Sequence, residues 1–270
     1  IFMQIQWYPG HMAKARRMLE ENLKLIDVVV ELVDARAPLA TRNPDFDALF
    51  SQKSRVILLN KSDLASAEQT KKWIEYYKAQ NINAIAFVST SSAKRKAAVS
   101  LIEAAAADKV AKMKEKGGMN QIRSAIQEAC KEKTERDRKR GILNRPVRAM
   151  VVGIPNVGKS TFINSLAGKA CAKTGNKPGV TKGKQWVKVS PYLELMDTPG
   201  LLWPKLENEA LAKHLAYIGS INDDIMDAER LAADLPGELI AICPNELKER
   251  YKKIEEGMAP HELLEAVARS

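Results

Sequence analysis

The stretch Gly153-Ile-Pro-Asn-Val-Gly-Lys-Ser160 fits the pattern GxxxxGK[ST] of a glycine-rich loop that binds phosphate groups. It follows the apolar run Ala149–Val152 and precedes a helical segment, Ser160–Leu166, which is the strand–loop–helix context that the pattern requires. Backbone N–H groups and the helix N-terminus then face the phosphates, the lysine reaches the terminal phosphates and the serine hydroxyl binds Mg²⁺. The expected nucleotide contacts are Asn156, Val157, Gly158, Lys159, Ser160 and Thr161, with Lys159 also acting in catalysis.

Two further segments supply candidate groups around the same metal ion. Asp197-Thr-Pro-Gly200 follows the apolar run Leu193–Met196, so Asp197 is expected at a strand end, where it can hold Mg²⁺ through water. Gly200 can offer its N–H to a γ-phosphate. Thr181, in Pro-Gly-Val-Thr between the two motifs, is the natural second hydroxyl, in a loop that orders around the γ-phosphate. We therefore predict that Ser160, Thr181 and Asp197 form a Mg²⁺ site and that Thr181 contributes to catalysis.

The identity of the nucleotide is predicted by Asn60-Lys61-Ser62-Asp63, directly after the apolar run Val56–Leu59. This segment looks like the NKxD guanine-recognition motif of the GTPase superfamily. In that superfamily the aspartate accepts hydrogen bonds from guanine N1–H and from the exocyclic amine. Adenine has no such pair of donors, so ATP would leave Asp63 unpaired. The resemblance implies GTP and GDP as ligands.

A turn after the next strand usually backs the guanine, and two segments compete for that position. Val88-Ser89-Thr90 lies at the end of the predicted strand Ala84–Val88, whereas Ser92-Ala93-Lys94 matches the usual Ser-Ala sequence literally. We favour Val88 and Ser89, because loops that contact nucleotides begin where a strand stops.

Apolar, β-branched runs alternate with helical stretches such as Ala67–Gln80, which predicts an α/β layered sheet. The guanine-reading segment precedes the phosphate-binding loop, the reverse of the order in most GTPases. We therefore predict a P-loop GTPase domain with circularly permuted motif order over residues 1–204 and a small α-helical C-terminal domain over residues 205–270. The predicted strands are Val28–Val33, Val56–Leu59, Ala84–Val88, Ala149–Val152, Trp186–Val189 and Leu193–Met196.

Composition narrows the classes of partner. The 270 residues carry a formal charge of +10, from 43 Lys and Arg against 33 Asp and Glu, which favours a polyanionic partner but also fits a generically basic protein. Residues 11–26 have the spacing of a basic amphipathic helix. We find no membrane span, secretory signal, prenylatable C-terminal cysteine, DNA-reading motif or CxxC pair. We expect a cytoplasmic, monomeric protein that binds neither DNA nor a membrane.

Four features together resemble the bacterial ribosome biogenesis GTPase A family. They are Trp7-Tyr-Pro-Gly-His-Met-Ala-Lys-Ala15, Val33-Asp-Ala-Arg36, the permuted motif order and the helical tail. The resemblance implies a GTPase that acts late in assembly of the large ribosomal subunit, contacts its rRNA and hydrolyses GTP when docked. It also makes residues 205–270 an RNA- or ribosome-binding domain. Permuted relatives that serve the small subunit commonly carry a zinc module, and none is recognised in this sequence.

Two residues are candidates for unusual roles in hydrolysis. Leu201 follows Gly200 where many GTPases have a glutamine that orients the attacking water, and leucine cannot do so. His11 either enters the site on docking to rRNA and positions the water, or it only packs or contacts RNA. Asn156 occupies the position of the asparagine that binds K⁺ in potassium-stimulated GTPases, or it simply suits a loop. A K⁺ ion there could stabilise charge in the transition state.

Overall fold

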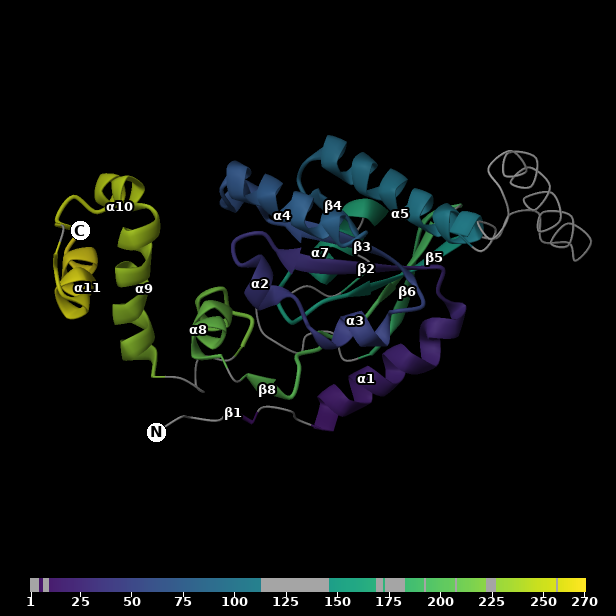
Figure 1. The fold of residues 1–270 in the computed structure, drawn as a ribbon, viewed down its shortest axis with the longest axis horizontal. Coiled ribbons are helices and arrows are strands. Elements are labelled where there is room, and N and C mark those ends of the chain that lie inside the picture. Colours follow the sequence, from purple (N-terminus) through teal and green to yellow (C-terminus); the bar gives the residue numbers. More distant parts are fainter. Residues whose placement is uncertain are drawn as a thin grey trace, which may run out of the picture. The chain divides into compact units, whose positions relative to one another are not determined.

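The computed structural model describes residues 5–6, 10–112, 146–168, 172, 183–191, 193–206, 208–221, 227–255 and 257–270. The chain divides into two compact units, Ile1–Leu206 and Glu207–Ser270 (Figure 1). Within the described residues, no helix has the length and apolar character needed to cross a membrane.

A six-stranded mixed sheet forms the centre of the first unit, in the order β4-β3-β2-β5-β7-β6. All neighbouring strands are parallel except β6, which pairs antiparallel with β7. The strands are β2 (Val28–Asp34), β3 (Ser54–Asn60), β4 (Asn83–Ala86), β5 (Val147–Val152), β6 (Gln185–Ser190) and β7 (Leu193–Asp197). A separate two-residue pair joins β1 (Ile5–Gln6) to β8 (Lys205–Leu206). The six predicted strands and the α/β fold class are confirmed.

Helices cover both faces of the sheet (Figure 1). Successive strand residues face opposite sides, and all seven residues of β2 are buried, so neither face of this strand meets solvent. On one face Val33, Ile57 and Leu59 pack against Trp73 and Tyr77 of α4. The helices of this unit are α1 (Gly10–Asn22), α2 (Pro38–Thr41), α3 (Asp45–Leu49), α4 (Ala67–Ala79), α5 (Ser92–Lys112) and α7 (Lys159–Ala167).

Helix α1 has the predicted amphipathic character. Met12, Ala15 and Leu19 are buried at helical spacing, while Lys14 and Arg17 are exposed. The helix is shorter than predicted, because it ends at Asn22 and gives way to a 3₁₀ turn, η1 (Leu23–Leu25). The Asn22 side chain donates a hydrogen bond to the Met18 carbonyl at 2.7 Å, within the last turn of the helix.

Strand β4 is also shorter than predicted, and it ends at Ala86 rather than at Val88. The reason is a contact with the guanine-motif segment. The Phe87 carbonyl accepts hydrogen bonds from the Ser62 backbone N–H at 3.2 Å and from the Ser62 hydroxyl at 3.1 Å. The buried Phe87 ring meets Phe162 of α7 edge-on, with ring centroids 5.1 Å apart. The chain therefore leaves the sheet here and turns toward α5.

A buried acid interrupts the apolar strand β2. Both carboxylate oxygens of Glu31 are buried without a hydrogen-bond partner among the described residues, and the nearest cation is Arg55, whose Nε lies 3.5 Å from Oε2. Burial raises the pKa of Glu31 to about 7, although Arg55 and Arg42 act to lower it. As pH rises, Glu31 therefore ionises at a lower pH in the unfolded chain than in the folded protein. Between about pH 4.5 and 7 the free energy of unfolding should fall by about 3 kcal/mol from this group.

Glu31→Gln should therefore be more stable relative to the wild type at pH 8 than at pH 5, because the amide cannot ionise. We expect the difference in melting temperature between variant and wild type to rise by roughly 5 °C between the two pH values. Thermal unfolding followed by circular dichroism measures it. The exposed Glu75→Gln on α4 is the matched control, and an equal rise in both variants would contradict a special role for Glu31.

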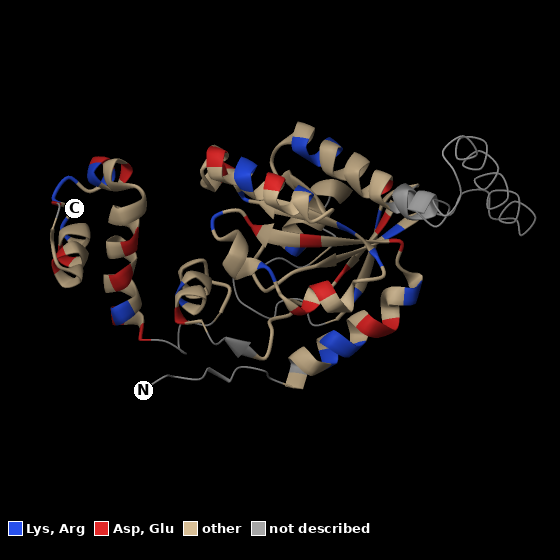
Figure 2. Ribbon diagram, viewed as in Figure 1, with Lys and Arg blue, Asp and Glu red and all other residues tan. Residues whose placement is uncertain are grey.

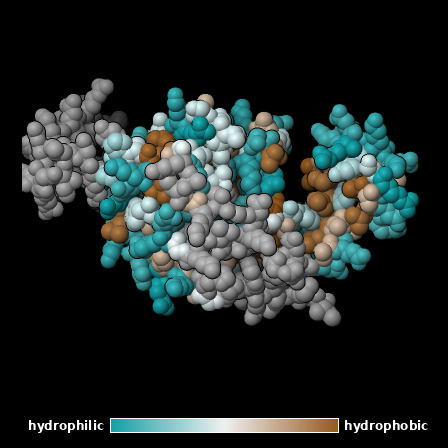
Figure 3. Space-filling view, turned by 180° about the vertical axis from the view of Figure 1, so that it is seen from behind, coloured by the Kyte–Doolittle hydropathy of each residue, from teal (hydrophilic) through white to brown (hydrophobic). Residues whose placement is uncertain are grey.

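The second unit is helical. Its elements are α8 (Glu209–Tyr217), α9 (Ala228–Ile242), α10 (Pro244–Arg250) and α11 (Pro260–Ala268). Leu247, Ile254 and Leu263 form a small core. Lys213 of α8 pairs with Asp234 of α9 at 2.6 Å, so α8 is joined to α9 by charge as well as by packing. Figure 3 shows apolar surface beside the hydrophilic surface of this unit, and Ile242 is 76% exposed.

Candidate nucleotide site

The phosphate-binding loop joins β5 to α7, as its sequence pattern requires. Gly158 has φ 93°, a region that side chains disfavour, and a Cβ there would lie 2.5 Å from the Asn60 side-chain nitrogen. The position therefore needs glycine for two reasons, backbone conformation and space. The lack of space comes from the direct packing of the loop against Asn60 at the end of β3.

Lys159 is buried inside this loop. Its ammonium donates to the carbonyl of Ile154 at 2.8 Å and to that of Gly153 at 3.2 Å. Burial lowers the pKa of Lys159 to about 8, while the negative charge of Asp197 acts in the opposite direction. A desolvated ammonium held by neutral carbonyls is poised to interact strongly with a phosphate.

Asp197 and Ser160 form a ligand pair suited to Mg²⁺. The Ser160 hydroxyl at the start of α7 donates to Asp197 Oδ2 at the end of β7, over 3.1 Å. The second oxygen, Oδ1, is buried and has no hydrogen-bond partner among the described residues. Burial raises the pKa of Asp197, against Lys159 and Ser160, which lower it. Hard oxygen ligands with an unused buried lone pair fit Mg²⁺, which would neutralise phosphate charge.

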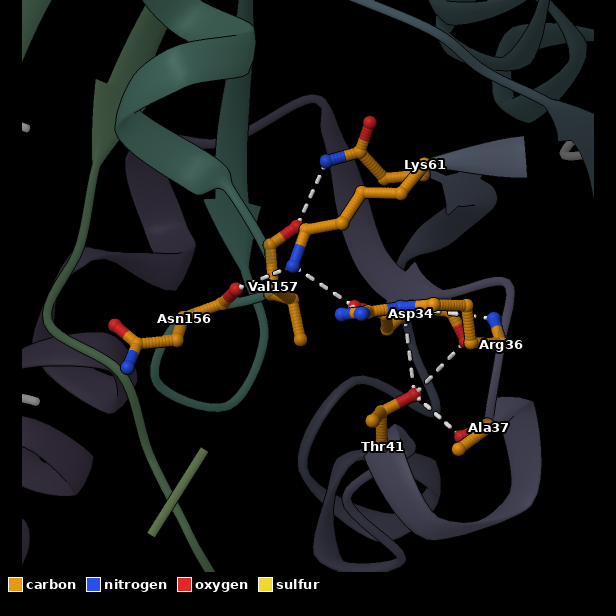
Figure 4. A network of polar contacts seen from close by, with 8 residues as sticks. Asp34, Arg36, Ala37, Thr41, Lys61, Asn156 and Val157 are labelled. Carbon is orange, nitrogen blue, oxygen red and sulfur yellow. Dashed lines mark hydrogen bonds and ion pairs between the residues drawn. The ribbon is translucent and has the colours of Figure 1, made fainter. Parts of the chain in front are cut away.

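The guanine-motif segment lies directly against the phosphate-binding loop. The Asn60 side chain donates to the Val157 carbonyl at 2.8 Å, and the Lys61 ammonium donates to the Asn156 carbonyl at 3.1 Å. Figure 4 shows the Lys61 side chain reaching across to Asn156. Asp63 is exposed, with its carboxylate accessible to a base. The structure thus brings the guanine-motif segment against the phosphate-binding loop, although the two are far apart in the sequence and stand in permuted order.

The loop that could back the guanine follows β4. Val88 and Ser89 are partly buried in this loop, where the Ser89 carbonyl accepts a hydrogen bond from Arg95 at 2.8 Å. Ser92, the alternative, is the exposed first residue of α5. Because Phe87 is tied to Ser62, the loop beginning at Val88 starts next to the guanine-motif segment. The assignment of Val88 and Ser89 stays a prediction.

The Asp197–Gly200 segment also packs on the phosphate-binding loop. A Cβ at Gly200 would lie 2.6 Å from the backbone nitrogen of Pro155, so the two loops approach as closely as glycine allows. Leu201 is buried, and its N–H donates to the Gly153 carbonyl at 3.2 Å. Sequence reasoning missed Asn43, which is 1% exposed and donates from its side chain to the Leu201 carbonyl at 2.9 Å. No local pattern marks Asn43, because its partner is far away in sequence.

The structure leaves three of the predicted site residues untested. Thr161 lies in the first turn of α7 and its side chain is exposed. Thr181 lies outside the described residues. His11 is the second residue of α1, but its side chain lies outside the described part of the chain.

The fold and the motif geometry define a P-loop GTPase domain with circularly permuted motif order. A family model described as "50S ribosome-binding GTPase" matches residues 148–228. "Ribosome biogenesis GTPase A" of Priestia megaterium is 48% identical, over 92% of this chain and 78% of its own length. The protein of the same name from Thermotoga maritima is 34% identical, over 84% and 70%. The solved structure "Crystal structure of GNP-bound YlqF from T. maritima" has a TM-score of 0.55 at 28% identity, over 94% of this chain and 95% of that one.

The chain belongs to the ribosome biogenesis GTPase A family. It is a GTPase involved in ribosome assembly, and its family implies a guanine nucleotide with Mg²⁺ as the usual cofactor.

Proposed function

We propose that this GTPase docks on the maturing large ribosomal subunit, contacts its rRNA, hydrolyses GTP while docked and thereby promotes a late assembly step. The observation that supports the nucleotide chemistry is the direct hydrogen bonding of Asn60 and Lys61 to the phosphate-binding loop, which favours a single site for guanine and phosphate. The family description "50S ribosome-binding GTPase" favours the large subunit. We infer that the protein acts in the cytoplasm as a monomer, and that residues 205–270 bind RNA or the ribosome.

A basic surface on α1 favours an rRNA partner. Lys14, Arg17 and Lys24 are exposed on this helix and its 3₁₀ extension (Figure 2). Such side chains attract phosphates and release counterions on binding, so affinity should fall steeply with salt. Replacing both Lys14 and Arg17 by Glu should weaken binding to the large subunit. Lys71 and Lys78, exposed on α4, provide a double variant with the same change of charge as a control.

The direct test compares GTP hydrolysis alone, with purified large subunits and with purified small subunits, in potassium buffer. Selective acceleration by the large subunit is the expected result. Acceleration by neither subunit would instead favour a second candidate, an RNA-bound switch that hydrolyses GTP slowly only to reset itself. The slow-switch function is favoured by Leu201, because this side chain is buried and has no group to orient a water.

We infer that His11 supplies the missing water-orienting group when rRNA docks the N-terminal segment. His11→Ala should then lose the acceleration by the large subunit while it keeps GTP affinity and subunit binding. His261, exposed in α11, gives a matched histidine-to-alanine control. Full stimulated turnover in His11→Ala, with normal binding, would remove His11 from the mechanism.

A potassium ion is the second proposed aid to hydrolysis. Asn156 is in the left-handed region at φ 62°, in the loop beside the expected β- and γ-phosphates. Ion coordination there would stabilise charge in the transition state, so hydrolysis should be about tenfold faster in potassium than in sodium at equal ionic strength. Asn156→Asp or Asn156→Ser should change that ratio. Equal rates in the two salts would eliminate the potassium site.

A further inference from the structure

Asp34 is a buried carboxylate at the carboxyl end of β2, and the proposed chemistry of nucleotide binding does not use it. Its side chain is 1% exposed. Arg36 donates from Nε to Oδ1 at 2.9 Å and from Nη2 to Oδ2 at 2.8 Å, and its backbone N–H donates to Oδ1 at 3.1 Å. The Lys61 ammonium lies 2.9 Å from Oδ2 (Figure 4). The carboxylate is thus held between two cations.

The charge of Asp34 is maintained despite its burial. Burial acts to raise the pKa of Asp34, but the hydrogen bonds and charges of Arg36 and Lys61 outweigh it and hold that pKa below its ordinary value. The carboxylate is therefore ionised at neutral pH. The carboxylate itself is buried, so removal of one cation would leave its charge less well compensated.

The Lys61 ammonium connects two parts of the nucleotide site. It lies 2.9 Å from Asp34 and donates to the Asn156 carbonyl at 3.1 Å. Lys61 also has φ 58°, a left-handed backbone conformation that residues with a side chain rarely adopt. A lysine stem has four rotatable carbons, so a single carbonyl contact would leave the ammonium free to move. Asp34 removes that freedom.

We propose that Asp34 is a positioning residue of the nucleotide site. It holds the Lys61 ammonium on the phosphate-binding loop and so fixes the separation between the guanine-reading segment and the phosphates. Arg36 closes the opposite side of the carboxylate and directs it toward Lys61. This role rests on the proposed assignment of Lys61 and Asn156 to the nucleotide site.

The test is a double-mutant cycle read by titration with a fluorescent GDP analogue and Mg²⁺. Asp34→Asn, which keeps shape and removes charge, should weaken binding roughly tenfold, the scale of one charge-assisted hydrogen bond. Lys61→Met should weaken it at least as much. If Asp34 acts through Lys61, Asp34→Asn should add less than twofold in the Lys61→Met background.

Glu31→Gln is the matched control, because it replaces a buried carboxyl group by an amide on the same strand, on the face opposite to Asp34. It should leave GDP affinity within twofold of the wild type. A second readout uses the nucleotide-free protein. Lys61 should be acetylated several times faster in Asp34→Asn than in the wild type, as followed by mass spectrometry, because its ammonium is no longer held.

The outcomes separate the positioning role from the nucleotide site itself. Unchanged affinity in Asp34→Asn, or a full tenfold loss in the Lys61→Met background, overturns the role of Asp34. Unchanged affinity in both Lys61→Met and Lys159→Ala overturns the site. Melting temperatures are measured first. If Asp34→Asn is unfolded, Asp34→Glu replaces it, because the longer side chain keeps the charge but displaces it from Lys61, and the same loss of affinity and coupling is expected.

Discussion

Lys159→Ala should weaken binding of GTP and GDP at least a hundredfold and reduce hydrolysis below detection. The ammonium is buried among the carbonyls of the phosphate-binding loop, 2.8 Å from the carbonyl oxygen of Ile154. It is thus already desolvated, and its interaction with a phosphate is stronger than in water. Buried contacts between a cation and a phosphate each contribute several kcal/mol, which accounts for the size of the loss.

The same substitution should leave the nucleotide-free protein nearly as stable as the wild type. Burial lowers the pKa of Lys159 from 10.5 to about 8, so the ammonium costs roughly 3 kcal/mol of stability at every pH below about 8. Alanine removes that cost but leaves a cavity, and the two effects should offset to within a few degrees of melting temperature. Calorimetric titration with GDP and thermal unfolding measure both quantities.

Lys188→Ala, on the exposed side of β6, is the control for the loss of one positive charge. It should bind GDP normally. Near-normal affinity in Lys159→Ala would contradict the placement of the phosphates at this loop, whereas a collapse in melting temperature would show that Lys159 stabilises the empty protein.

Asp63→Asn should lower GTP affinity at least a hundredfold and create affinity for xanthosine triphosphate. In the predicted guanine contact, the carboxylate would offer two acceptor oxygens to the N1–H and amine of guanine, whereas the asparagine amide offers one acceptor and one donor group. Xanthine carries a carbonyl in place of the amine and matches that pattern. A ligand that leaves hydrogen-bonding groups of a binding site unpaired binds far more weakly than the ligand that matches them.

Competition between GTP and xanthosine triphosphate measures this switch and contains its own control. Binding of the xanthine nucleotide proves that the variant is folded. If Asp63→Asn keeps GTP affinity and gains none for xanthosine triphosphate, then Asp63 does not read the base. The prediction tests the exposed carboxylate of Asp63 directly.

Local patterns in the sequence were sufficient to predict the fold class and the six strands of the central sheet. Apolar runs predicted the six strands of the sheet, and the two motifs predicted which strand ends carry polar groups. The motif contacts were not local. The hydrogen bonds from Asn60 and Lys61 to the phosphate-binding loop follow from the permuted order only once the sheet is assembled.

Other features depended on distant partners that no pattern reveals. An acid in the middle of an apolar strand is usually expected to face solvent, yet Glu31 is buried with the rest of β2. The cations that act on its carboxylate, Arg42 and Arg55, come from later segments. The early end of β4 depends on Ser62, and the attachment of Leu201 depends on Asn43. The pair β1 and β8 has two residues in each strand, too few for a periodic signal.

The position of β5 beside β2 has a consequence for how the protein is made. Strands β2, β3 and β4 come from the first part of the chain and β5, β6 and β7 from the later part, so the two halves of the sheet meet only where β5 pairs with β2. During translation at roughly 5 to 20 residues per second, residues 34 to 147 take roughly 6 to 23 s. For that interval the backbone N–H and C=O groups of β2 that later pair with β5 have no partner strand and can pair with other nascent chains. Nucleotide cannot protect it, because the phosphate-binding loop has not yet been synthesised.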